Sequence, residues 1–168
     1  YDIAGRLTSY TSGGGNTIRY DYDKLNNLVE KAFVDAQGEE SAPGVLYGYD
    51  ALGQRVSMMD ASGESSYTWD GLGRITSVTD GSGETVSYEY DGSDRLAAIV
   101  YPDGESVRYG YDLNDNLTSV TDRTGAETTY VYDGLNRVTE IHRPNGISTY
   151  MTYNGHDQIV TMENICDE

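Results

Sequence analysis

Carboxylates recur beside tight-turn residues throughout this chain, and their chemistry has to be considered first. The segment Asp80-Gly81-Ser82-Gly83 is a typical case, and it offers hard oxygen atoms of the kind that bind Ca²⁺. Each such loop supplies one carboxylate, whereas calcium loops supply several. An Asp beside a turn more often accepts hydrogen bonds from nearby backbone N–H groups. We therefore expect no metal site and assign these Asp residues to the turns.

Nucleophilic and acid–base chemistry has few candidate residues. His142 and His156 occupy repeat positions that hold other residues elsewhere in the chain. A Ser/His/Asp or Cys/His centre needs a base oriented by a third group, and no spacing here indicates one. Cys166 has no neighbouring Cys or His for a zinc site. We expect no catalytic residue, no cofactor and no enzymatic activity.

The elements that position the Asp residues form a repeat. An aromatic residue followed by Asp or Asn begins units near residues 1, 22, 49, 69, 90, 111, 132 and 153, mostly 21 residues apart. We expect one repeat array over residues 1–168, with a lengthened loop near Glu39–Gly44 in the long second unit. The signature residues are Tyr1, Asp2, Tyr22, Asp23, Tyr49, Asp50, Trp69, Asp70, Tyr90, Asp91, Tyr111, Asp112, Tyr132, Asp133 and Tyr153.

Each unit contains two turns and two short strands. In one strand Val107, Tyr109 and Tyr111 alternate with polar or small residues, the pattern of a half-buried antiparallel strand. If units stack, Tyr should lie beside Tyr along the sheet. In the other strand Ile75 and Val78 are three apart, which indicates a β-bulge or two partly covered faces. The fold class is all-β: repeated hairpins in a continuous curved antiparallel sheet, roughly sixteen strands and little helix.

Composition narrows the function classes. The chain has 16 Tyr, 20 Gly and a net charge of −17, which excludes a phosphate-binding surface for nucleic acid and disfavours anionic membranes. No apolar run approaches the ~20 residues of a membrane span, so we expect no membrane insertion. A start at Tyr1 without Met and without a signal peptide suggests an excised segment.

Carbohydrate binding is the main alternative to a structural role. Exposed Tyr rings stack on sugar faces, and amide or acidic groups bond hydroxyls. The Tyr residues recur in every unit, however, whereas a binding site would require exposed Tyr at one place only. The recurrence therefore favours Tyr as packing between hairpins, and it leaves glycans as possible partners.

The phrase WDGLGRITSVTD at Trp69–Asp80, followed by YDGSDRL from Tyr90, resembles the YD repeats of Rhs proteins. Similar repeats occur in the C component of bacterial Tc toxins and in animal teneurins. The resemblance implies hairpins joined edge to edge into a sheet that spirals into a hollow shell. In bacterial relatives the shell encloses a toxic C-terminal domain.

By this resemblance the chain is a structural shell or scaffold segment of a bacterial protein that is secreted or held at the cell surface. The implied partners are flanking YD repeats and an enclosed toxin domain. A cell-surface carbohydrate-binding or adhesion module is the alternative. The chain lacks the DPxGL-like autocleavage segment of the family, and eight repeats would form only part of a wall. An open array also leaves unpaired edge strands.

Overall fold

The computed structural model of the chain describes residues 1–166 and contains no helix among them, so no described helix could cross a bilayer. The predicted all-β fold is confirmed. The described residues form fifteen strands, against roughly sixteen expected. The strands are β1 (Ser9–Thr11), β2 (Thr17–Tyr22), β3 (Leu28–Val34), β4 (Glu40–Tyr49), β5 (Arg55–Asp60), β6 (Gly63–Trp69), β7 (Ile75–Thr79), β8 (Thr85–Tyr90), β9 (Leu96–Val100), β10 (Ser106–Tyr111), β11 (Leu117–Thr121), β12 (Glu127–Tyr132), β13 (Val138–His142), β14 (Ile147–Tyr153) and β15 (Ile159–Cys166).

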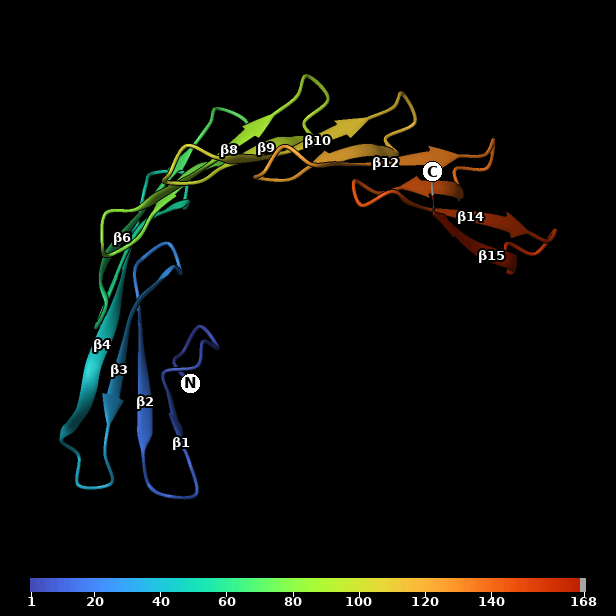
Figure 1. The fold of residues 1–168 in the computed structure, drawn as a ribbon. Coiled ribbons are helices and arrows are strands. Elements are labelled where there is room, and N and C mark those ends of the chain that lie inside the picture. The colour runs from blue at the N-terminus through green and yellow to red at the C-terminus, as the bar shows by residue number, and fades with distance from the viewer. Residues whose placement is uncertain (167–168) are drawn as a thin grey trace. The chain divides into compact units, whose positions relative to one another are not determined.

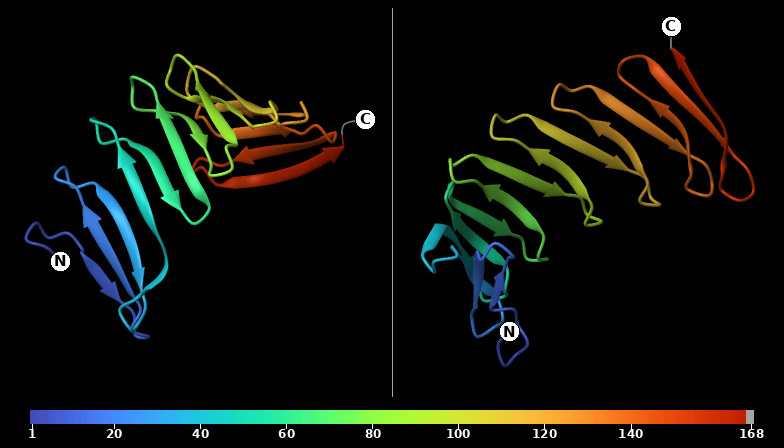
Figure 2. Two further views of the ribbon diagram at one scale, coloured as in Figure 1. Left: turned by 90° about the vertical axis from the view of Figure 1, so that its left-hand side faces the viewer. Right: turned by 90° about the horizontal axis from the view of Figure 1, so that it is seen from below.

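The strands follow one another in sequence order in an open antiparallel sheet, without a crossover (Figures 1 and 2). Contacts divide the chain into two compact units, residues 1–86 and 87–168. Within each unit every strand forms a hairpin with the next one in sequence. The expected array extends over residues 1–168, of which 167–168 lie outside the described residues.

Successive hairpin turns lie at alternate ends of the strands. At one end lie the eight segments that begin with the repeated Asp or Asn, which we call the YD turns: residues 2–6, 23–27, 50–54, 70–74, 91–95, 112–116, 133–137 and 154–158. In each, the first residue donates its N–H to the carbonyl of the fifth, as Asp133 does to Arg137 at 2.9 Å. The fourth N–H returns to the first carbonyl. The fourth residue has positive φ, 61° for Asn136, which is the pattern of a tight hairpin turn followed by a left-handed residue.

A β-bulge follows each YD turn that joins two paired strands. Thr68 lies opposite Ser77, but the next residue, Trp69, lies opposite Ile75, so Thr76 is the extra residue. The bulge predicted from Ile75 and Val78 is therefore confirmed. It explains why the strand that leaves a YD turn does not alternate simply.

The long second unit differs from the prediction of a lengthened loop. Its turn, residues 35–39, has the ordinary length, and β4 begins directly afterwards at Glu40. The additional residues lengthen β3 and β4 and are accommodated by two register shifts in their pairing. Pro43 and Gly44 lie where the register shifts. Regular hydrogen bonding between the strands is already interrupted there, so the missing N–H of proline removes no interstrand hydrogen bond.

The sheet has little fully buried interior. Among residues 1–166 the buried hydrophobic residues are Val34, Ala98 and Met151, and most other strand residues are half-buried. The expectation that Tyr lies beside Tyr is wrong. Each return-strand Tyr pairs with the outgoing strand of its own hairpin, so Tyr109 lies opposite Val120, for example. Val120 in turn lies opposite Thr128, so the direct cross-strand neighbours along this row are not Tyr.

Candidate functional site: the ladder of YD turns

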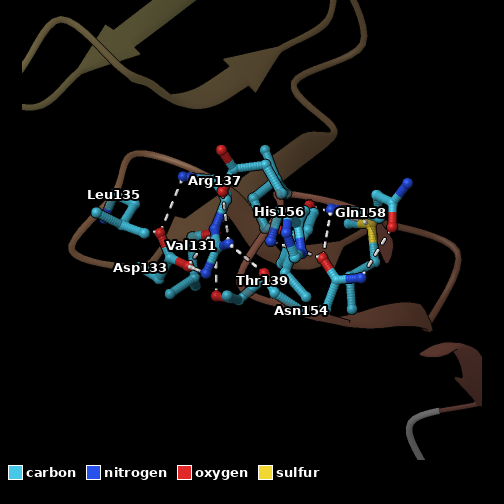
Figure 3. Close-up of polar contacts among 12 residues, drawn as sticks. Val131, Asp133, Leu135, Arg137, Thr139, Asn154, His156 and Gln158 are labelled. Carbon is cyan, nitrogen blue, oxygen red and sulfur yellow. Dashed lines mark hydrogen bonds and ion pairs between the residues drawn. The ribbon is translucent and has the colours of Figure 1, made fainter. Parts of the chain in front are cut away.

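The Asp that begins a YD turn holds the turn closed with both carboxylate oxygens. In the turn drawn in Figure 3, Asp133 Oδ1 accepts the backbone N–H of Leu135 at 2.9 Å and of Arg137 at 3.1 Å. Its Oδ2 accepts Arg137 Nε at 2.8 Å and lies 2.6 Å from Nη2. One carboxylate therefore holds the backbone of its turn and the side chain of the fifth residue. The side-chain-to-backbone hydrogen bonds expected of the turn Asp are confirmed.

These hydrogen bonds also set the ionisation of the carboxylates. The Arg137 side chain and backbone N–H lower the pKa of Asp133 below its ordinary value. At Asp112 the side-chain amide of Asn116 is the main cause of the same lowering of the pKa. The pKa of Arg137 is raised, chiefly by its hydrogen bond to Asp133. The turn carboxylates are held as hydrogen-bond acceptors and are poor proton donors at neutral pH.

Several of the aromatic residues that precede a YD turn donate a hydrogen bond to the carbonyl of the residue that follows the preceding YD turn. Tyr153 donates its hydroxyl to the backbone carbonyl of Val138 at 2.6 Å. The Arg137 guanidinium carbon lies 4.6 Å from the centre of the Tyr153 ring, close enough for a cation–π contact. Equivalent bonds join Tyr22 to Leu7, Tyr49 to Leu28, Trp69 Nε1 to Arg55, Tyr111 to Leu96 and Tyr132 to Leu117.

The fifth residue of one turn also bonds to the next YD turn. Arg137 Nη1 donates to the carbonyl of Asn154 at 3.3 Å and to Asp157 Oδ1 at 2.8 Å. Arg95 makes the same pair of bonds to the turn at residues 112–116, and Arg6 makes them to the turn at residues 23–27. Asn116 Nδ2 donates to Asn136 Oδ1 at 2.9 Å. These bonds link the turn at residues 2–6 to the turn at 23–27, and they link the turns from 91–95 to 154–158 to one another in order. We call the linked turns a ladder.

This ladder explains an unexpected choice of residue at the fourth turn position. The positive φ there favours Gly, yet Asn26, Asp115, Asn136 and Asp157 occupy it, and each accepts the cross-turn bond just described. Asn and Asp tolerate the left-handed region better than other residues with a side chain. Where the preceding fifth residue is Asn27 or Gln54, the fourth residue is Gly53 or Gly73. These acceptors were not predicted, although Asn or Asp in a position that favours Gly was the signal.

The signature residues occupy equivalent places with one exception. From Asp2 to Asp133 each repeated Asp begins a YD turn, and from Tyr22 to Tyr153 each aromatic residue ends a strand. Tyr1 precedes the first strand and is exposed.

Two of the groups considered for catalysis, His142 and Cys166, lie apart from the ladder. His142 Nδ1 is 2.8 Å from Ser148 Oγ and Nε2 is 3.0 Å from Glu140 Oε2, an order that resembles a catalytic triad. Ser148 is fully buried, so a substrate cannot reach its hydroxyl. His156 lies in the last YD turn, and Cys166 is exposed at the end of β15. Within residues 1–166 no group of three His, Cys, Asp or Glu could hold a metal ion.

Two further features lie near the opposite end of the strands. Arg123 pairs with Asp103 and Glu105 of the neighbouring turn, and its guanidinium carbon is 4.5 Å from the centre of the Tyr101 ring. In the compact unit formed by residues 1–86, a half-open hollow of about 370 Å³ lies beside β1–β4. Tyr10, Ile18, Phe33, Val34 and Ala42 form its apolar lining, and Ser12, Asn16, Thr17 and Ser41 supply polar groups.

Solved structures of the same fold are Tc toxin complexes. The chain is similar to a TcdB2–TccC3 complex at a TM-score of 0.78 and 15% identity, over 97% of this chain and 10% of that one. A TcdB2–TccC3–Cdc42 structure gives 0.71 and 18%, over 89% and 9%. A Tc holotoxin pore of Photorhabdus luminescens gives 0.58 and 14%, over 97% and 11%. The chain therefore spans about a tenth of these proteins, and at this identity the likeness shows the fold alone.

No curated protein sequence matches this chain. The RHS repeat family, in contrast, matches residues 1–40, 49–85, 69–107, 90–126 and 111–149. The segment that falls between the first two matches includes part of β4, where the long unit departs from the repeat. Because these matches cover most of the chain and the YD turns recur with one geometry, this chain belongs to the RHS repeat family.

Proposed function

We propose that this chain is a structural shell or scaffold segment of a bacterial Rhs-type protein, and that its residues carry no enzymatic activity and bind no cofactor. The observation that supports this proposal most strongly is the ladder of YD turns. Where the fifth residue is Arg6, Arg95, Asn116 or Arg137, the turn is closed by its own Asp and bonds to the next turn through that fifth residue, so a further hairpin adds to the end by the same contacts. In this proposal residues 1–168 form a single array and the signature residues are structural.

We further propose that the parent protein is secreted or displayed at the bacterial surface and encloses or presents a C-terminal toxin. The fold shared with Tc toxin complexes supports this proposal. The partners would then be flanking YD repeats and the enclosed domain. Nucleic acid is not a partner in this proposal, because a net charge of −17 repels phosphate. Membrane insertion is not part of it either.

The test is denaturing mass spectrometry of the natural full-length protein after native size exclusion. An enclosed, cleaved cargo predicts a C-terminal fragment that co-elutes with the repeat-bearing chain and separates only on denaturation. A single uncleaved chain, with no segment protected from added protease in the native state, would contradict encapsulation. It would leave the scaffold role standing.

A carbohydrate-binding or adhesion role is a second candidate, and the hollow beside β1–β4 favours it. Tyr10 and Phe33 offer rings, and Asn16 and Ser41 offer hydrogen-bonding groups, where the first repeat meets the long second repeat. This is the combination of apolar surface and few polar groups that small-ligand sites use. A glycan array in which the chain gives signals that Tyr10→Ala abolishes would support this role, and an array without signals would remove it.

A further inference from the structure

Two positive charges occupy places that aliphatic residues hold elsewhere in the sheet. In each hairpin closed by a YD turn, two large residues of the return strand, in most cases Tyr, lie opposite two residues of the outgoing strand. The partners of the first are Lys31, Met58, Val78, Ile99, Val120, Ile141 and Met162, and those of the second are Leu28, Arg55, Ile75, Leu96, Leu117, Val138 and Ile159. Among these positions of the described strands, only those of Lys31 and Arg55 carry a charge.

Both cations lie against the ring of Tyr47, on the strand between them. Lys31 Nζ, from β3, lies 5.6 Å from the centre of that ring, and the guanidinium carbon of Arg55, from β5, lies 5.9 Å from it. The same carbon of Arg55 lies 4.5 Å from the centre of the Tyr67 ring on β6. All four residues belong to the compact unit of residues 1–86. Two charges from neighbouring hairpins therefore meet at one aromatic ring.

Neither cation has an acidic partner. Within residues 1–166, Lys31 and Arg55 form no ion pair and donate no side-chain hydrogen bond. Both residues are half-buried, in a chain whose net charge is −17 and in which carboxylates are abundant. A half-buried charge without a partner costs free energy, so the aliphatic residues of the other hairpins would suit the fold better at both places.

Other arginines of the chain indicate what is missing. Four guanidinium groups lie over a Tyr ring and also bind a carboxylate: those of Arg6, Arg95, Arg123 and Arg137. Arg95, for example, lies 4.6 Å from the centre of the Tyr111 ring and 2.8 Å from Asp91 Oδ2. Arg55 is placed over Tyr67 in the same way, but the carboxylate is absent. A stacked guanidinium keeps its N–H edge free, and that edge matches a carboxylate in geometry and charge.

We infer that Lys31 and Arg55 form a binding site for a carboxylate ligand beside Tyr47 and Tyr67. The carboxylate accepts hydrogen bonds from the Arg55 guanidinium, and the Lys31 ammonium adds a second positive charge. The two Tyr rings offer apolar surface to the carbon atoms next to the carboxylate. The site shares no residue with the hollow beside β1–β4, and it depends neither on a toxin cargo nor on carbohydrate binding.

Titration of the 168-residue chain with succinate tests the inference, followed by NMR of the Arg55 Nε–H group at a constant ionic strength of about 0.15 M. We expect a saturable shift with a dissociation constant on the order of 10 mM. Lys31→Met should weaken the binding by about tenfold, because one of the two charges is lost. A wild-type chain without a saturable shift would overturn the inference. Saturation by inorganic phosphate without any response to succinate would overturn the assignment to a carboxylate.

A purely structural role for the two cations is the alternative, since cation–π contacts also join strands. The double variant Lys31→Met, Arg55→Leu separates the two, because it installs residue types that other hairpins hold at these places, such as Met58 and Leu96. The inference predicts that the backbone amides of Tyr47 and Tyr67 no longer respond to succinate, while the urea midpoint without succinate is unchanged or higher. A double variant that responds like the wild type would overturn it.

The matched control changes the net charge equally at another place. In Lys24→Met, Arg108→Leu the two changes fall on exposed residues away from Tyr47, one in a YD turn and one on β10. This variant should keep the wild-type dissociation constant for succinate. An equal loss of binding in the control would assign the response to the overall charge of the chain, and the site at Lys31 and Arg55 would be refuted.

Discussion

Arg137 shows how much one side chain does in this fold. It pairs with Asp133 in its own turn, lies over Tyr153, and bonds to the carbonyl of Asn154 and the carboxylate of Asp157 in the next turn. The planar guanidinium has five N–H donors in a fixed arrangement, so it can serve both turns at once. Asn116 has a shorter side chain and also bonds to two turns: its amide donates to Asp112 in its own turn and to the amide oxygen of Asn136 in the next. The fifth turn position therefore requires a side-chain N–H donor that extends to the next turn, and this donor need not be charged.

Tyr111→Phe should lower the free energy of unfolding by about 0.5–1.5 kcal/mol, because it removes the hydroxyl that donates to the Leu96 carbonyl at 3.1 Å. The matched control is Tyr109→Phe in the same strand, whose hydroxyl has no recorded hydrogen-bond partner among the described residues. Urea unfolding measures both changes. Equal losses from the two variants would show that the hydroxyl bond to the preceding turn contributes nothing specific.

Arg95 and Asp115 should be energetically coupled across two turns. Asp115→Gly relieves a left-handed side-chain conformation (φ 65°) but removes the acceptor of Arg95, which lies 2.8 Å away. With Arg95→Ala already present, only the relief remains, so the same change should be more stabilising there than in the wild type. A double-mutant cycle by urea unfolding gives the coupling free energy. Additive effects would mean that this contact does not select Asp.

At the scale of strands and turns, much of the fold followed from local chemistry. Gly, Asn and Asp near each repeat, together with strict alternation at Val107–Tyr111, were enough to predict hairpins. The lengthened strands β3 and β4 were not predictable, because added residues can extend a loop or two strands with equal local consistency. The aliphatic partner of Tyr109 and the cross-turn bonds depend on pairing register, which no single repeat specifies.

Deletion of Thr118 should be far more damaging than its substitution. Tyr111 lies opposite Leu117 and Gly110 lies opposite Ser119, so Thr118 is the extra residue of the bulge. Removing it leaves β11 without its bulge, so either Leu117 and the turn before it or residues 119–121 must turn to the opposite face of the sheet. We expect thermal unfolding by circular dichroism to show a loss well above the ~1 kcal/mol of an ordinary substitution, with Thr118→Ala near that ordinary value. Similar stability of the two variants would mean that the bulge is not required.

Across the whole chain, stability has to come from contacts between neighbouring hairpins. The described residues include few buried hydrophobic side chains, and strands contact mainly the strands beside them in sequence. Stability in such an array is close to a sum over units and their neighbour contacts. The acidity opposes it, because a net charge of −17 repels itself within one chain. The turn carboxylates are the part of that charge that stabilises the fold.

The lowered pKa values of the carboxyls predict how the stability of the folded chain depends on pH. Among residues 1–166 of the folded chain, hydrogen bonds lower the pKa of nine carboxyls: Asp2, Asp23, Asp60, Asp70, Asp80, Asp91, Asp112, Asp122 and Asp133. In the unfolded chain an Asp titrates near about 3.9. The stability that these groups contribute is therefore present above about pH 4 and is lost as the pH falls through the lowered values. The urea midpoint should therefore fall steeply below about pH 4.

The chain supplies its own control for this profile. Asn154 takes the place of Asp in the last YD turn, accepts the N–H groups of His156 and Gln158, and pairs with the Gln158 side chain. Asp23→Asn with Asp112→Asn should therefore keep two turns closed by amide pairs with Asn27 and Asn116 while removing two lowered pKa values. Urea midpoints of this variant should fall less between about pH 4 and pH 2 than those of the wild type. An identical acid limb in both proteins would place the acid sensitivity outside these two turns, and Asp23 and Asp112 would then act there only as hydrogen-bond acceptors.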